Sequence, residues 1–157
     1  MHILEQIEAI KRLKYRYFRC LDCKDWETLA ECFTADATVA YDSGKFSFSG
    51  RSEVMGFLRG ALGSREVISL HQGHHPEVEI SGEIATGIWY LEDYLIFVPT
   101  NTRIRGAGFY RDEYLCEGGV WKIKHTGYVR SFEEIQDGNA TPPLWVLTNY
   151  GDHLRRA

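Results

Sequence analysis

The sequence has no long hydrophobic run, no apolar amino-terminal leader and no cluster of basic residues. A membrane-spanning helix needs roughly 20 consecutive apolar residues, and no stretch of the chain approaches that length. The opening MHILEQIEAIKRLKY mixes charged with apolar side chains, so it lacks the apolar region of a secretory signal peptide. We therefore expect a soluble, cytoplasmic protein that does not associate with a membrane.

Basic residues are also fewer than acidic residues. The chain has 18 Lys and Arg against 22 Asp and Glu, which gives a net charge of −4 at pH 7. Proteins that bind nucleic acid neutralise its phosphates with clustered Lys and Arg. The composition therefore predicts that nucleic acid is not a partner.

The sequence also lacks a second cysteine pair. Its four cysteines include one CxxC motif, Cys20 to Cys23, and no second motif that would complete a zinc site of this kind. We predict ordinary reduced thiols, as in a cytosolic protein, and no metal. Internal repeats and low-complexity segments are absent as well, and 157 residues fit one domain.

Aromatic residues, in contrast, are abundant. They make up 13% of the chain, with nine Tyr and four Trp, enough to line a pocket as well as to fill a core. A small hydrophobic ligand is therefore compatible with the composition.

The apolar pattern predicts helices in the first part of the chain. Apolar residues recur every three or four positions from Ile3 to Leu21, which predicts an amphipathic helix ending near Asp22. Asp25 suits the N-cap of a second helix that runs through Phe33 and is broken by residues 34–37. A third helix is expected from a Ser52 cap to about residue 63.

The remainder predicts strands. Residues 37–41 and 66–132 have strand character, with turn signals at 81–82, 99–101 and 117–119. Helices followed by a meandering antiparallel sheet indicate the α+β class. We expect one domain over residues 1–137, and a tail over residues 138–157 that packs on the domain or on a neighbouring subunit.

Asp22 is the first candidate for a functional residue. A carboxylate at the C-terminal end of a helix faces the negative end of the helix dipole, which disfavours it for stability. This position favours a function for Asp22, although a solvated turn aspartate remains the alternative.

A second candidate lies in the predicted strand ATGIWYLEDYLIFV, residues 85–98. Asp93 shares one face with Trp89 and Leu91, whereas Glu92 shares the other with Tyr90. Whichever face is inward, one carboxylate lies among apolar residues, where it needs a partner or serves as an acid or base. The alternative is a strand edge at which both carboxylates reach water.

Three histidines fall within SLHQGHHP, residues 69–76. A metal could use His71 with His75, or His74 with His75 in a turn forced by Pro76, but no third ligand lies nearby. His71 follows an apolar run and is the most suited to lie within a strand and face inward. A neutral imidazole held by a carboxylate is suited to removing a proton near neutral pH.

Tyrosines and an arginine complete the candidates. Tyr17, Tyr41 and Tyr110 could each donate to a carbonyl or enolate oxygen, or could be core residues. Arg130 could bind a carboxylate or phosphate, or form a surface ion pair.

The motifs YFRCLDCKDW, FTADATVAYDSG, SLHQGHHPEVEI and GGVWKIKHTGYVR together resemble the SnoaL-like branch of the nuclear transport factor 2 superfamily. The likeness spans roughly residues 7–134 and is strongest to the bile acid 7α-dehydratases, with a more distant similarity to scytalone dehydratases. It implies a cone-shaped curved antiparallel sheet wrapped by N-terminal helices, the NTF2-like or cystatin-like α+β barrel, with a ligand inside the cone.

The resemblance also implies roles for individual residues. The bile acid family's catalytic tyrosine, aspartate and histidine correspond to Tyr17, Asp22 and His71. Its sheet aspartate corresponds to Asp93, and its pocket tyrosine and arginine correspond to Tyr41 and Arg130.

From this resemblance we expect a lyase that needs no cofactor and dehydrates a steroid-like or related polycyclic ketone, with an acid and a coenzyme A thioester among the candidate forms. The expected assembly is a homotrimer or homodimer. A ketosteroid-type isomerase and a non-catalytic carrier of hydrophobic ligands are the alternatives.

Overall fold

The computed structural model describes residues 2–139. The chain begins with the helices α1 (Ile3–Cys23) and α2 (Trp26–Glu31), continues with the strands β1 (Phe33–Tyr41) and β2 (Phe46–Ser49), and returns to a helix in α3 (Arg51–Leu62). Four long strands follow: β3 (Val67–Ser81), β4 (Ile84–Phe97), β5 (Thr102–Glu117) and β6 (Val120–Gln136). A short 3₁₀ helix, η1 (Val98–Thr100), joins β4 to β5.

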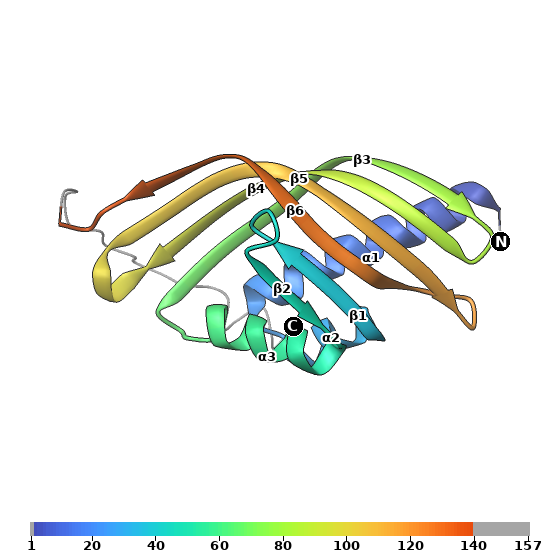
Figure 1. Cartoon of the computed structure of the whole chain (residues 1–157), viewed down its shortest axis with the longest axis horizontal. Helices are drawn as coiled ribbons and strands as arrows, with labels where there is room; N and C mark the ends of the chain where they lie inside the picture. The colour runs from blue at the N-terminus through green and yellow to red at the C-terminus, as the bar shows by residue number, and fades with distance from the viewer. Residues whose placement is uncertain (1, 140–157) are drawn as a thin grey trace.

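The strands form one six-stranded sheet in the order β2-β1-β6-β5-β4-β3. All neighbours are antiparallel except β1 and β6, which run parallel. The long strands arch over α1, and the β1–β2 hairpin and α3 lie beneath them (Figure 1). The α+β class and the curved sheet are thus confirmed, although the sheet stays open, with β2 and β3 as its edges.

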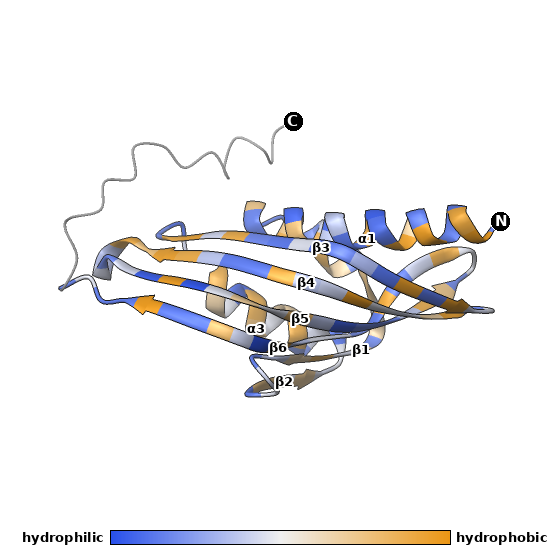
Figure 2. Ribbon diagram, turned by 90° about the horizontal axis from the view of Figure 1, so that it is seen from above, coloured by the Kyte–Doolittle hydropathy of each residue, from blue (hydrophilic) through white to orange (hydrophobic). Residues whose placement is uncertain are grey.

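Alternation along the strands decides which residues face the helices. Hydrophilic and hydrophobic residues alternate along the long strands (Figure 2), and on β4 the buried residues are those of Asp93's parity, including Trp89 and Leu91. Glu92 lies on the opposite, solvent-facing side and pairs with Arg105. The inward face of the sheet therefore carries Asp93 into the space between sheet and helices.

The helix predictions were correct in part. α1 ends at Cys23, and Asp25 caps α2 by accepting a hydrogen bond from the backbone N–H of Thr28 at 3.2 Å. However, α2 stops at Glu31 because Phe33 already belongs to β1, where it is fully buried. The Ser52 cap was wrong: α3 begins at Arg51 after Gly50, whose backbone φ of 89° favours glycine.

The prediction of a turn at His74 and His75 was also wrong. β3 runs without interruption through residues 67–81, and the irregularity is a β-bulge between His74 and Glu77, where His75 has a φ of 48°. The predicted tail lies mostly beyond residue 139 and so outside the described residues. No helix within the described range is both long and apolar enough to cross a membrane.

Candidate active site

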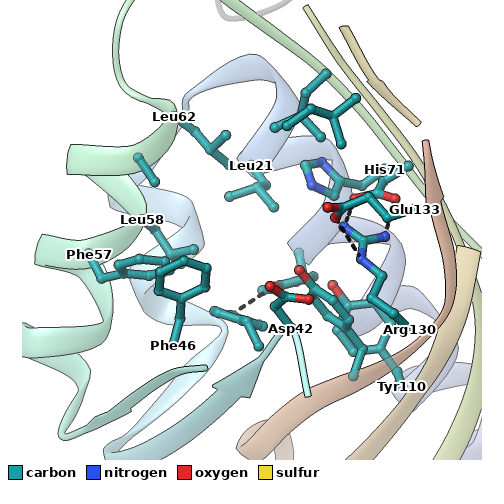
Figure 3. Close-up of a pocket in the computed structure, with 17 residues that line it drawn as sticks. Leu21, Asp42, Phe46, Phe57, Leu58, Leu62, His71, Tyr110, Arg130 and Glu133 are labelled. Carbon is teal, nitrogen blue, oxygen red and sulfur yellow. Dashed lines mark hydrogen bonds and ion pairs between the residues drawn. The ribbon is translucent and has the colours of Figure 1, made fainter. Parts of the chain in front are cut away.

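A cavity of about 190 Å³ lies between the concave face of the sheet and α3. One wall is apolar and comes mainly from α3 and β2, with Phe46, Phe57 and Leu58 among its side chains. The opposite wall carries the polar groups of the sheet, including His71, Arg130 and Glu133 (Figure 3). A ligand in this space would contact hydrocarbon on one side and titratable groups on the other.

The Asp22 carboxylate lies against His71 at the polar wall. Its Oδ1 is 2.6 Å from Nδ1 of His71 and accepts a hydrogen bond from the Ser69 hydroxyl at 2.8 Å. Its Oδ2 accepts one from the backbone N–H of His71, also at 2.8 Å. The end of α1 thus holds β3 through one carboxylate, and this contact explains an aspartate at an unfavourable helix end.

The same contact orients the His71 ring. Because Oδ1 of a carboxylate can only accept, Nδ1 carries the hydrogen, and in the neutral tautomer this leaves the lone pair on Nε2. The His71 side chain is 10% exposed and lines the cavity. Asp22 lies behind the imidazole, so the pair has the arrangement of a general base and the residue that orients it.

Three tyrosines lie deep in the cavity. The hydroxyls of Tyr17 and Tyr41 are 2.8 Å apart, and Tyr110 lies beside them. Burial raises the pKa of all three phenols well above the ordinary value. They therefore stay protonated and can donate to an oxygen on which negative charge develops.

An ion pair closes the sheet side of the cavity. Arg130 donates from Nη1 to Oδ1 of Asp93 at 2.5 Å and from Nη2 to Oδ2 at 2.8 Å. The Asp93 side chain is 4% exposed, so the pair is bidentate and largely desolvated. The Nε atom of Arg130 is 3.4 Å from Glu133, without hydrogen-bond geometry.

Sheet register explains why these residues meet. His71 pairs with Asp93, Asp93 with Gly106, and Gly106 with Glu133, so four neighbouring strands contribute one residue each to a row across the sheet. The row has a glycine where the Arg130 guanidinium lies. A Cβ at position 106 would contact Nη1 of Arg130, and would lie 3.0 Å from its Cζ and 3.1 Å from Oδ1 of Asp93.

Substituting Gly106 by alanine should displace Arg130 from Asp93 and leave a buried carboxylate without its partner. We expect Gly106→Ala to lower the free energy of unfolding by about 1–3 kcal/mol, measured by urea denaturation. Gly60→Ala in α3 is the control, because a Cβ there would meet nothing within 4 Å; it should be neutral or stabilise by about 0.5–1 kcal/mol. Equal stability of the two variants would contradict the close packing of the Arg130 guanidinium against Gly106.

A buried polar network lies beneath the tyrosines. Lys14 Nζ is 2.7 Å from Asp112, both side chains are fully buried, and Lys14 also donates to the Thr126 hydroxyl at 3.1 Å. Thr126 and Tyr114 each donate to Asp112 at 2.7 Å. Burial lowers the pKa of Lys14, and Asp112 opposes this effect. The Nζ atom is 3.6 Å from the Tyr110 ring centroid, so the network supports the floor of the cavity.

The structure brings the predicted site residues together. All of them line the cavity except Asp22, which contacts it through His71. His74 and His75 lie apart from it, in a hollow with Tyr90. Among the described residues, no cluster of three or more His, Cys, Asp or Glu has the arrangement of a metal site.

Four residues of this region were not predicted from the sequence: Asp42, Glu133, Gly106 and Lys14. Lys14 had a detectable signal, because it lies four positions from both Ile10 and Phe18 on the apolar face of α1. Nothing local singled out the other three, since their importance depends on strands far away in the sequence.

Solved structures with the same fold come from several bacteria. A scytalone dehydratase-like protein of Novosphingobium aromaticivorans matches with a TM-score of 0.78 and 22% identity, over 90% of this chain and 94% of that one. The hexachlorocyclohexane dehydrochlorinase LinA-type3 of Novosphingobium barchaimii matches with a TM-score of 0.76 and 22% identity, over 90% and 97%. Rv3472, a protein of unknown function from Mycobacterium tuberculosis, matches with a TM-score of 0.70 and 24% identity, over 82% of this chain and 73% of that one.

The sequence itself matches a family model, that of the SnoaL-like domain, over residues 2–127. This match covers most of the chain, including α1, the paired Asp22 and His71, and the cavity wall as far as the middle of β6. The protein is therefore a member of the SnoaL-like family.

Proposed function

We propose that this protein is a lyase that needs no cofactor and eliminates water from a hydroxylated, steroid-like or related polycyclic ketone. The observation that carries the proposal is the 2.6 Å contact between Asp22 and Nδ1 of His71, which leaves Nε2 as a base at the polar wall of the cavity, opposite its apolar wall. Structural relatives named as a dehydratase-like protein and a dehydrochlorinase agree with elimination chemistry.

The first step is removal of a proton from carbon. In a ketone conjugated to the reacting carbons, Nε2 of His71 takes the acidified C–H proton, and the C–H electron pair moves through the conjugated system to the carbonyl oxygen. The product of this step is a dienolate and a His71 imidazolium, whose charge the Asp22 carboxylate stabilises. A hydrogen bond from Tyr17 or Tyr41 stabilises the developing oxyanion.

The second step expels the hydroxyl group. The dienolate electrons return, form the new carbon–carbon double bond and break the C–O bond. The leaving hydroxide takes the proton that His71 acquired and departs as water, so protons balance and His71 returns to its neutral form. Both oxygens of Asp93 accept hydrogen bonds from Arg130, so we assign Asp93 to the positioning of Arg130 and not to proton donation.

The direct test uses a 7α-hydroxy-3-oxo-4-ene bile acid presented as the free acid, the methyl ester and the coenzyme A thioester. We expect the absorbance of an extended dienone to appear with at least one form, and a metal chelator to leave the rate unchanged. A shifted double bond with the hydroxyl retained would instead indicate an isomerase. Binding without conversion of any form would overturn the dehydratase proposal in favour of a carrier.

A further inference from the structure

We infer that the cavity discriminates against anionic ligands, and that Asp42 and Glu133 impose this selection at its mouth. The substrate class is then the uncharged polycyclic ketone, not its carboxylate. This inference rests on the proposed function only in assuming that the substrate occupies this cavity. It differs from one of the two roles expected for Arg130 from the sequence, the binding of a carboxylate or phosphate.

The positive charge of Arg130 is already paired within the protein. Its two terminal nitrogens are both bound to Asp93, and its side chain is 13% exposed. Glu133 lies 3.4 Å from the third nitrogen, Nε. A guanidinium already paired with one carboxylate and adjacent to a second offers little attraction to an incoming anion.

The remaining charges at the cavity are negative. Among the described residues that line it, Asp42, Asp93 and Glu133 carry carboxylates, and Arg130 carries the sole permanent cation. The Asp42 and Glu133 side chains are 26% and 35% exposed, which places them toward solvent, whereas Tyr17 and Tyr110 are almost fully buried. Asp42 has Lys45 3.8 Å away, but that lysine is 68% exposed, so its pairing is weak.

The position of Asp42 is fixed by the backbone. Asp42 and Ser43 both have left-handed φ values, 50° and 57°, in the turn between β1 and β2. The backbone N–H of Ser43 donates to the Tyr128 carbonyl at 2.9 Å, and the backbone N–H of Arg130 approaches the Ser43 hydroxyl at 3.4 Å. This turn is therefore held against β6 beside Arg130, and it keeps the Asp42 carboxylate at the cavity (Figure 3).

The size of the cavity brings ligand and carboxylates together. Its volume of about 190 Å³ lies below the ~300–1,000 Å³ of pockets that enclose drug-sized molecules. A polycyclic ligand whose reacting ring lies at His71 would thus extend to the mouth. A carboxylate on its far end would meet Asp42 and Glu133, and the like charges would repel.

The experiment compares ligands that differ only in charge. Binding of methyl 2-naphthoate and 2-naphthoate, and of the methyl ester and free acid of the bile acid, is measured by calorimetry on the full chain. We expect each ester to bind about tenfold more tightly than its acid. The ratio should shrink when salt rises from about 20 mM to about 500 mM, because the carboxylates at the mouth are partly exposed.

Variants connect the selectivity to the named residues. The double variant Asp42→Asn/Glu133→Gln should bring the ester-to-acid ratio close to one. Glu134→Gln is the matched control, because Glu134 lies next to Glu133 on β6 but outside the cavity, in a separate surface hollow with Arg105, and it should leave the ratio unchanged. Circular dichroism checks that each variant is folded.

The outcomes separate this inference from the proposed function. Acids that bind as tightly as their esters, a ratio that the double variant does not change, or no binding of either naphthoate probe would each overturn the inference. Selectivity in the naphthoate pair, with no binding and no turnover of the bile acid forms, would support the inference and refute the steroid-like substrate.

Discussion

Replacing His71 with alanine should lower kcat by about 10²–10⁴-fold, the usual contribution of a general base. The reason is geometric: in the proposed mechanism His71 is the base and Asp22 orients it, and among the described residues no other histidine lines the cavity. The measurement is the rate of product formation with the substrate form that the wild-type protein converts. KM should change much less than kcat, since the apolar wall and the tyrosines remain in place.

Two further variants make this result specific. His71→Gln keeps a side chain that can donate to Asp22 but cannot take up the proton, so it should be as inactive as His71→Ala. His74→Ala removes a histidine of the same strand that lies outside the cavity, in the hollow with His75 and Tyr90, and it should leave kcat unchanged. If His74→Ala lowered kcat as much as His71→Ala, the assignment of the base would be wrong.

Asp22→Asn tests the orienting carboxylate. Asp22 accepts hydrogen bonds from the Ser69 hydroxyl and from two nitrogens of His71, whereas asparagine offers one accepting oxygen and one donating amide group. If the amide group faces Nδ1, the imidazole must carry its hydrogen on Nε2, where the base is needed. We therefore expect kcat to fall with little loss of folded protein. Full activity would refute the proposal that Asp22 orients His71.

Replacing Lys14 with methionine should have the largest effect on stability, a loss of about 3–5 kcal/mol in the free energy of unfolding. The substitution leaves Asp112 without its cation in a position where both side chains are fully buried. Hydrogen bonds from Thr126 and Tyr114 remain, but they do not neutralise the charge. Urea denaturation with linear extrapolation measures the loss.

Lys11→Met is the matched control, since it makes the same change three residues earlier on α1. Lys11 pairs with Glu8 at 3.2 Å, but both side chains are substantially exposed, so we expect a change within about 1 kcal/mol. The double variant Lys14→Met/Asp112→Leu should recover part of the loss, because it removes both buried charges together. Similar stabilities for Lys14→Met and Lys11→Met would show that the buried pair contributes little.

The sequence was sufficient where local periodicity decides the outcome. The apolar repeat of α1 predicted a helix ending near Asp22, and strand alternation separated Asp93 from Glu92, because side-chain direction depends only on the repeat of the element. The helix dipole also drew attention to Asp22, because a carboxylate at this end of a helix needs compensating contacts. In the structure its carboxylate accepts hydrogen bonds from His71 and Ser69, and its functional role stays a prediction.

Tertiary structure alone decided which charges meet. Lys14 and Asp112, and likewise Asp93 and Arg130, are far apart in the chain and become partners through strand register and the docking of α1 on the sheet. The glycine that makes room for Arg130 and the carboxylates at the cavity mouth have no local signature for the same reason. The sequence by itself thus determined the long helix, the α+β class and the alternation of the long strands, because these follow from local periodicity. The register of the sheet decided which charges surround the cavity, because that depends on distances between strands.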